Sequence, residues 1–169
     1  MTKDKTGFDT RAIHAGQKND PVTGAVMTPI YATSTYAQES PGVHKGYEYS
    51  RTSNPTRKAL EDCIASLENG DQGFAFASGM AATSTILELL DAGDHVIASD
   101  DLYGGTYRLM EDVRKRTSSL DFSFVDFSKT SNILDAIKPN TKMLWLETPS
   151  NPLLKITDLE EISSVIEQK

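Results

Sequence analysis

The sequence predicts an α/β fold in which parallel strands are covered by helices on both faces. From residue 57 onward, short apolar runs of strand length alternate with longer stretches of helical periodicity. This alternation is typical of parallel strands that are joined by crossover helices. The chain of 169 residues, with 38% apolar and 24% charged residues, also has the length and composition of a soluble domain with a real core.

The expected elements begin with a helix at about 55–68, which stops at Gly70. An apolar strand that starts at Phe74 comes next and leads into a helix from Met80 to Ala92-Gly93. The elements expected after this helix are strands at 95–99, 122–127 and 142–147, and helices at about 106–116, 132–137 and 159–168.

The first 53 residues form a different kind of segment, rich in Thr, Tyr, Gly and Pro and without helical or strand periodicity. A disordered tail and an arm packed on another surface are both open interpretations. Disordered segments are poor in aromatic residues, so the four tyrosines favour an arm laid across a partner subunit: Tyr31, Tyr36, Tyr47 and Tyr49. The expected organisation is an intersubunit arm at 1–53 and an α/β domain at 54–169.

Composition excludes several classes of partner. The net charge of -7 leaves no basic stripe that could neutralise nucleic-acid phosphates. No apolar run is long enough to span a membrane, and the polar N-terminus is not a secretory signal. Cys63 is the only cysteine, which favours a reducing compartment, so the cytoplasm is expected. The histidines lack the spacing of metal ligands, and no metal is expected.

The turn at Ser78-Gly79-Met80 is a candidate anion site. The first amides of a helix have no internal partners, the helix dipole favours negative charge there, and glycine permits a close approach. An ordinary strand-to-helix turn is the alternative. The turn matches neither the G-x-G-x-x-G fingerprint nor a phosphate loop, so a dinucleotide or NTP site is not indicated.

Polar residues also follow the other expected strands, at the sheet edge where ligands bind in parallel α/β folds. One loop carries Tyr103 beside Gly104-Gly105, and another carries Asn151 between prolines. The arm supplies Arg51, and arginine is well suited to a bidentate grip on phosphate. A flat aromatic ligand that carries a phosphate would satisfy all of these groups.

These residues together resemble the Cys/Met-metabolism family of pyridoxal-phosphate (PLP) enzymes, and most closely the cystathionine γ-lyases and γ-synthases. The resemblance covers essentially the whole chain and rests on four motifs in order: Tyr49-Ser50-Arg51 with Asn54-Pro55-Thr56, Ser78-Gly79-Met80-Ala81, Tyr103-Gly104-Gly105-Thr106, and Glu147-Thr148-Pro149-Ser150-Asn151-Pro152. It implies the large domain of the aspartate aminotransferase-like, fold type I PLP-dependent transferases, here truncated and preceded by an extended N-terminal arm.

The resemblance also implies a role for each matching residue. Gly79 and Met80 match amides that bind the cofactor phosphate, and Tyr103 matches the tyrosine that stacks on the pyridine ring. Asn151 matches the asparagine that bonds the phenolic oxygen. Tyr49 and Arg51 match a pair that reaches the phosphate of the neighbouring subunit. Tyr103 and Tyr49 are the catalytic candidates.

Substrate binding is implied for Arg51, Tyr103, Arg108 and Glu48. For Arg108 and Glu48, a solvated surface charge is the alternative interpretation. The lysine that forms the Schiff base is not matched by any residue, since Lys155 follows Asn151 too closely. We therefore expect an N-terminal portion of an enzyme, as a truncated gene, a fragment or a shortened version.

The implied function is PLP-dependent transsulfuration on C–S bonds of cystathionine-like amino acids, of the γ-lyase or γ-synthase type. Cystathionine β-lyase and O-acylhomoserine sulfhydrylase are alternatives within the family. An alternative of another class is a non-catalytic fragment that pairs with a full-length subunit. The expected partners are a small sulfur amino acid and further copies of the chain, in a tetramer that is a dimer of dimers with shared sites.

Overall fold

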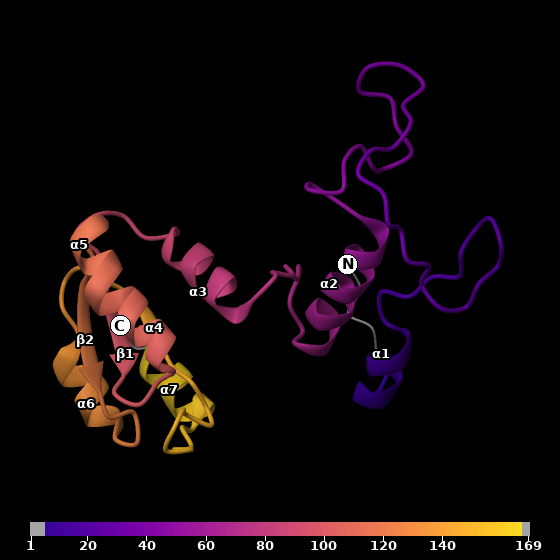
Figure 1. Ribbon diagram of the computed structural model, residues 1–169. Coiled ribbons are helices and arrows are strands. Elements are labelled where there is room, and N and C mark those ends of the chain that lie inside the picture. The colour runs from indigo at the N-terminus through magenta and orange to yellow at the C-terminus, as the bar shows by residue number, and fades with distance from the viewer. Residues whose placement is uncertain (1–5, 167–169) are drawn as a thin grey trace. The chain divides into compact units, whose positions relative to one another are not determined.

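The computed structural model describes residues 6–166 of the chain, which form two compact units (Figure 1). One unit extends to Phe76, and the other starts at Ala77. Within residues 6–166, no helix combines the length and the apolar character that crossing a membrane would require. The expected division into a 1–53 arm and a 54–169 domain stays a prediction.

The C-terminal unit is built on a parallel sheet of three described strands, β1 (His95–Ser99), β2 (Asp121–Val125) and β3 (Thr141–Trp145). The strands lie in the order β2-β1-β3, and His95 pairs with both Asp121 and Thr141. The expected parallel sheet is thus confirmed for these strands, whose bounds lie within two residues of the predicted ones.

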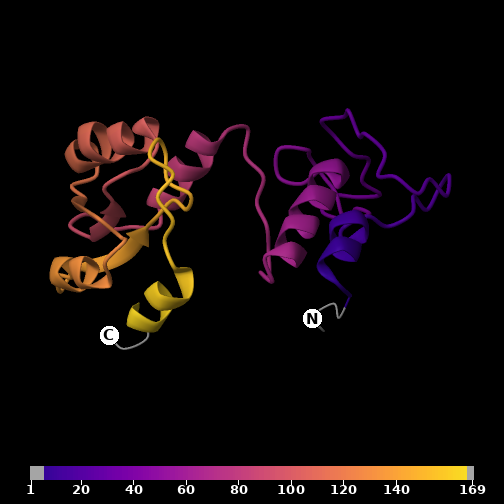
Figure 2. The same cartoon turned by 90° about the horizontal axis from the view of Figure 1, so that it is seen from below.

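Helices cover both faces of this sheet, as the alternating pattern predicted (Figure 2). One layer holds α3 (Gly79–Leu87) and a continuous helical stretch made of α4 (Gly104–Arg108), the π-helical segment η1 (Leu109–Arg114) and α5 (Lys115–Thr117). The other layer holds α6 (Thr130–Ala136) and α7 (Leu159–Ile166). The residues at the predicted end of the last helix, 167 and 168, lie outside the described part.

The central strand β1 is buried along its whole length, which explains the apolar residues Val96 to Ala98 at its centre. Val96 and Ala98 pack in the cluster under α3 and η1, with Met110. Ile97 points to the other layer and packs with Ile133 and the α7 helix. The sheet therefore has a separate apolar core on each face.

The expected strand from Phe74 is wrong for this structure, because residues 73–77 carry no strand. Phe74 is 72% exposed and Phe76 43% exposed. A strand needs a neighbour that satisfies its backbone groups, and no described residue forms a ladder with this segment. The Ala75 amide instead donates to the Glu61 carboxylate at 3.0 Å.

The helix that follows the turn is shorter than expected and ends at Leu87 instead of Ala92-Gly93. The amides of residues 88–90 donate to carbonyls three residues back, so the helix tightens in its last turn. The Asp91 amide then donates to the Asp94 carboxylate at 2.9 Å. Gly93 adopts a φ of 91°, which reverses the chain toward β1.

The N-terminal unit contains an unexpected short helix, α1 (Phe8–His14), packed on α2 (Pro55–Leu67). The predicted first helix is confirmed as α2. Gly16 follows α1 with a φ of 75°, and a Cβ there would lie 2.3 Å from the Ala59 carbonyl oxygen. Only glycine permits this close approach of the two segments. Loops and two isolated bridges make up residues 17–53.

The buried imidazole of His95 makes the C-terminal unit sensitive to acid. The side chain is fully buried, with its ring nitrogens 2.7 Å from Thr141 Oγ1 and 2.9 Å from Ser123 Oγ. Burial, helped by the Lys138 charge and opposed by Asp121, holds the His95 pKa below its ordinary value of 6.5. The unfolded chain therefore binds a proton more readily than the folded chain.

We expect the free energy of unfolding to be fully retained above about pH 6.5 and to fall as the pH drops from there toward the lowered pKa of His95. Chemical denaturation at about pH 7.5 and about pH 5 measures this loss. His95→Gln should flatten the pH dependence of the free energy of unfolding. His14→Gln changes an exposed histidine and should leave that pH dependence unchanged. Equal slopes in both variants would contradict the assignment.

Candidate functional site

An open pocket of about 440 Å³ lies at the carboxyl edge of the sheet in the C-terminal unit. Its walls come from the N-terminus of α3, the start of α4 and the end of β3. The lining residues are Ser78, Gly79, Met80, Thr83, Tyr103, Thr106 and Glu147. The structure thus brings together Gly79, Met80 and Tyr103, three of the residues that the sequence singles out.

The α3 N-terminus supplies backbone donors to this pocket. Ser78 is the N-cap residue in an extended conformation, and its side chain accepts a hydrogen bond from the Ala81 amide at 3.1 Å. Within residues 6–166, the amides of Gly79 and Met80 have no acceptor. Both residues line the open pocket, and a Cβ on Gly79 would meet nothing within 4 Å. Free donors at the positive end of a helix favour an anion.

The Tyr103 ring forms the aromatic wall and lies directly against Gly105. A Cβ on Gly105 would come to 2.4 Å from Tyr103 Cε1 and 3.0 Å from Met80 Sδ. The absence of a side chain at position 105 therefore lets the ring settle beside Met80. Tyr103 remains 48% exposed, which leaves ring surface for a ligand.

Glu147 is a site residue that the sequence reasoning passed over, although it opens the quoted Glu147–Pro152 motif. Its Oε2 accepts a hydrogen bond from the Tyr103 backbone amide at 2.9 Å. This bond joins the loop after β3 to the N-cap residue of α4 and fixes the backbone that carries the ring. The position of Glu147 directly after an apolar strand was the signal that could have identified it.

The two loops at the sheet edge are also tied together through Asp101. Its buried carboxylate accepts hydrogen bonds from the Ser150 hydroxyl and from the Leu153 amide, the latter at 3.0 Å. The Ser150 hydroxyl in turn accepts from the Lys155 amide at 2.8 Å. The loop after β3 is therefore held against the loop after β1.

Asn151 and Arg108 lie outside the set of described residues that line the pocket. Asn151 sits exposed in the loop after β3, between the bonded Ser150 and a cis proline peptide. Arg108 is exposed at the end of α4, and a Cβ on Gly104 would lie 3.2 Å from its Nη1. Their proposed contacts with a ligand stay predictions.

Lys155 forms an ion pair with Asp100 at 3.0 Å and lies 3.8 Å from Asp126. The hydrogen bond to Asp100 and the surrounding carboxylates raise the Lys155 pKa above its ordinary value. A lysine that forms covalent bonds with carbonyl groups needs a lowered pKa. The surroundings of Lys155 therefore shift its pKa in the wrong direction for a Schiff-base lysine. This agrees with the sequence argument that Lys155 lies too close to Asn151 for that role.

Glu48, Tyr49 and Arg51 lie in the N-terminal unit. The Glu48 carboxylate is 2.8 Å from His44 Nε2. The guanidinium of Arg51 stacks over the Tyr49 ring, 5.1 Å from its centroid. Both Tyr49 and Arg51 are exposed, and within residues 6–166 the Arg51 guanidinium has no hydrogen-bond or ion-pair partner. This pair is free to bind an anion.

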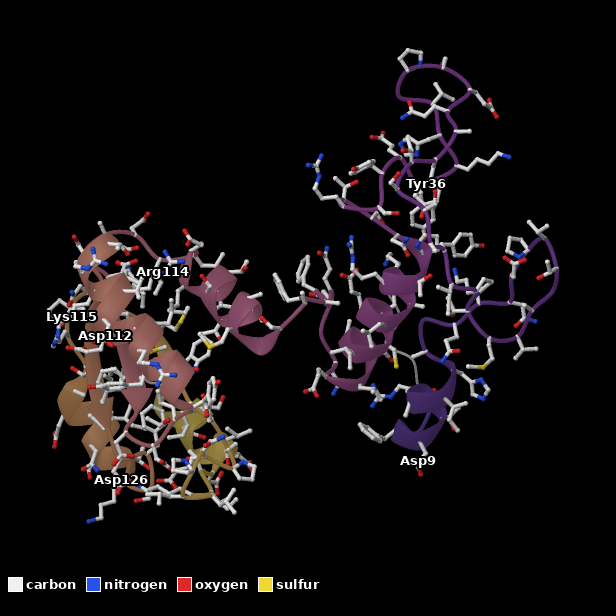
Figure 3. All side chains as sticks on the ribbon, viewed as in Figure 1. Asp9, Tyr36, Asp112, Arg114, Lys115 and Asp126 are labelled. Atoms are coloured by element: carbon white, nitrogen blue, oxygen red, sulfur yellow. The ribbon has the colours of Figure 1, made fainter. Side chains whose placement is uncertain are left out.

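The opposite flank of α3 is anchored to the helical stretch. Arg114, labelled in Figure 3, donates to the Ser84 hydroxyl at 2.9 Å and also bonds the Glu88 carboxylate. These bonds join η1 to the C-terminal part of α3. The amides of Gly79 and Met80 and the ring of Tyr103 are therefore carried by elements that are bonded to each other.

The pocket fits a phosphorylated aromatic ligand such as PLP. The free amides of Gly79 and Met80 suit a phosphate, and the exposed face of Tyr103 suits a planar ring. The Glu147 carboxylate is held by the Tyr103 amide. Free donors at one end and an aromatic face at the other are the features such a ligand requires.

Comparisons with known proteins agree with this geometry. The family model of the Cys/Met-metabolism PLP-dependent enzymes matches residues 9–169. Cystathionine β-lyase of Coxiella burnetii is 65% identical over 98% of this chain and 43% of its own length. A probable cystathionine γ-synthase of Herpetosiphon aurantiacus is 55% identical over 94% of this chain and 50% of its own. Cystathionine γ-lyase of Bacillus subtilis is 52% identical over 92% and 41%.

Two solved structures confirm the expected fold class. The crystal structure of metB from Corynebacterium glutamicum has a TM-score of 0.94 and 44% identity, and the match covers 100% of this chain and 44% of that one. Cystathionine γ-lyase from Lactobacillus plantarum, complexed with L-serine, has a TM-score of 0.90 and 48% identity over 96% and 42%. The chain spans at most half the length of these relatives. The chain belongs to the family of Cys/Met-metabolism PLP-dependent enzymes.

Proposed function

We propose that this chain supplies the phosphate-binding and ring-stacking half of the active site of a PLP-dependent transsulfuration enzyme, of the cystathionine γ-lyase or γ-synthase type. The observation that carries the proposal is the pocket in which the α3 N-terminus faces the Tyr103 ring. Family membership is shared by β-lyases, γ-lyases and γ-synthases among the relatives. The β-lyase and O-acylhomoserine sulfhydrylase activities remain alternatives.

Each residue of the pocket has a task in this proposal. The amides of Gly79 and Met80 donate to the phosphate, and the Tyr103 ring stacks on the pyridine ring. Asn151, in the loop that Asp101 holds at the sheet edge, bonds the phenolic oxygen. PLP, when bound, acts as an electron sink for a carbanion next to the amino nitrogen of the substrate.

Tyr49 and Arg51 complete the site from a neighbouring copy of the chain. We propose that Arg51 grips the phosphate bound at that copy's turn and that Tyr49 lies beside it, so the assembly is a homo-oligomer, a dimer of dimers. The support is the exposure of both side chains and the free guanidinium. Glu48 and Arg108 would contact a small sulfur amino acid. A reducing, cytoplasmic setting belongs to the proposal because Cys63 is the only cysteine.

A titration of the 169-residue chain with PLP and, separately, with pyridoxal tests the phosphate site. We expect PLP to bind at least about tenfold more tightly, because pyridoxal lacks the group that accepts the charge-assisted hydrogen bonds. The change in cofactor absorbance reports binding without a lysine anchor. Equal affinities for the two compounds would remove the basis for the phosphate role of Gly79, Met80 and Arg51.

The products from cystathionine decide the type of reaction. An enzyme that includes this chain would consume water and release cysteine, 2-oxobutyrate and ammonia by γ elimination, or homocysteine, pyruvate and ammonia by β elimination. The non-catalytic alternative predicts neither product and a stable complex with a longer subunit. The non-catalytic alternative is supported by the pocket lining, which contains no lysine among the described residues. Size-exclusion chromatography of the mixed chains, with the product assay, separates the two functions.

A further inference from the structure

The Arg57 side chain donates several hydrogen bonds to backbone carbonyls, and all of these carbonyls belong to the turn that carries Arg51. Its Nη1 donates to the Ser50 carbonyl at 3.1 Å, and its Nη2 donates to the Thr52 carbonyl at 2.9 Å and the Arg51 carbonyl at 3.5 Å. One guanidinium therefore spans three consecutive carbonyls of the 50–52 turn.

The same guanidinium is fixed from the other side by α2. Its Nε lies 3.3 Å from Glu61 Oε1, one helical turn further along. The Glu61 side chain is only 17% exposed and also accepts the Ala75 amide, so it cannot swing away freely. Arg57 is thus a rigid link between a helix and the turn, and a lysine ammonium would lack the planar fork that the link uses.

Other bonds hold the start of the turn. The Ser50 amide donates to the Ser34 carbonyl at 2.8 Å, and the Ser50 hydroxyl accepts from Asn54 Nδ2 at 3.1 Å. The Thr52 and Ser53 amides donate to the Tyr49 carbonyl at 3.1 and 3.0 Å, and these bonds close the turn on itself. The backbone of Tyr49 pairs with Thr35 only through an isolated bridge. Among the described residues, the carbonyls of Arg51 and Thr52 accept hydrogen bonds from Arg57 alone, so the backbone that carries the Arg51 side chain depends on this guanidinium.

We propose that Arg57 is a positioning residue that orients Tyr49 and Arg51 for binding the cofactor phosphate. The inference rests on the proposed function, because it takes Arg51 as the phosphate ligand. Arg57 itself does not touch the phosphate, because its Nε faces Glu61 and both terminal nitrogens donate to carbonyls of the turn. Glu61 shares the role, since it holds the guanidinium in place.

Amide hydrogen exchange on the 169-residue chain without PLP tests the first half of the inference. In Arg57→Lys the amides of Thr52 and Ser53 should exchange at least about tenfold faster, the factor that loss of one charge-assisted hydrogen bond produces. Glu61→Gln should give a smaller increase, because the carbonyl contacts remain. Lys58→Gln, which breaks only the exposed pair with Asp62, should leave both amides unchanged. Unchanged exchange in Arg57→Lys would overturn the inference.

The ratio of PLP affinity to pyridoxal affinity tests the second half, since a purely structural defect would weaken both compounds alike. Arg57→Lys and Arg51→Ala should both lower this ratio about tenfold, whereas Arg51→Ala should leave amide exchange as in the parent chain. A ratio that falls in Arg51→Ala but not in Arg57→Lys would overturn the positioning role alone. A ratio unchanged in Arg51→Ala would overturn the phosphate role of Arg51, and the positioning role with it.

Discussion

Gly105→Ala is expected to weaken PLP binding about three- to tenfold without unfolding the chain. The added methyl group would lie 2.4 Å from the Tyr103 ring, so the ring must leave its place beside Met80. The ring is exposed enough to move, so the fold survives while the stacking surface is lost. Aromatic stacking contributes about 0.5–1.5 kcal/mol beyond area burial, which sets the size of the effect. Titration with PLP measures it.

A double-mutant cycle shows whether the effect acts through the ring. Tyr103→Ala should weaken PLP binding to a similar extent, and Gly105→Ala should add little to it, because the ring is already gone. Gly104→Ala is the matched control, since its methyl group would meet only the flexible end of Arg108 at 3.2 Å. Fully additive losses at positions 103 and 105 would rule out the stacking role.

Ile97→Ala is expected to lower the free energy of unfolding of the C-terminal unit by about 2–5 kcal/mol. Ile97 is completely buried in the central strand and packs with Ile133 and Phe127 on the α6 and α7 side of the sheet. Its truncation removes apolar contacts and leaves a cavity that the two neighbouring strands prevent from closing. Denaturant unfolding measures the loss, and Trp145, the only tryptophan, reports on this unit.

Leu89→Ala is the control for this substitution. Leu89 is 80% exposed, so its truncation should change the free energy of unfolding by less than about 0.5 kcal/mol. Comparable losses at positions 89 and 97 would mean that the core assigned to the sheet does not carry the stability of this unit.

The elements that sequence predicts well here are those with a strong local signal. Strand β1 has an apolar centre at Val96 to Ala98, and α2 has an asparagine cap and a proline at its first position. The Phe74 segment carries an equally apolar signal but forms no strand, because a strand depends on a neighbour that local sequence does not specify. Helix α1 has only seven residues, too few to show a helical period.

In the candidate site, too, local sequence signals predicted some features, and contacts between distant residues were missed. Tyr103 could be placed at the sheet edge in advance, since parallel strands bring their carboxyl ends to one edge. Ser78 and Gly79 are grouped with it through the expected Phe74 strand, but in the structure they reach the pocket as the N-terminus of α3. The bond between Glu147 and the Tyr103 amide spans 44 positions of sequence, and the Asp101–Ser150 bond spans 49. No local pattern encodes such bonds. Nor could the sequence show that Arg57, which is part of no predicted binding motif, would hold the turn of Arg51.

The strand order β2-β1-β3 has a consequence for how the protein is made. The central strand leaves the ribosome first of the three, gains β2 as its neighbour next, and gains β3 last. At synthesis rates of about 5–20 residues per second, one edge of β1 waits several seconds for its partner. During that interval Val96 to Ala98 offer an apolar, unpaired edge to other nascent chains. Chaperone demand and aggregation during overexpression should therefore arise from the central strand, which is the best-protected part of the finished sheet.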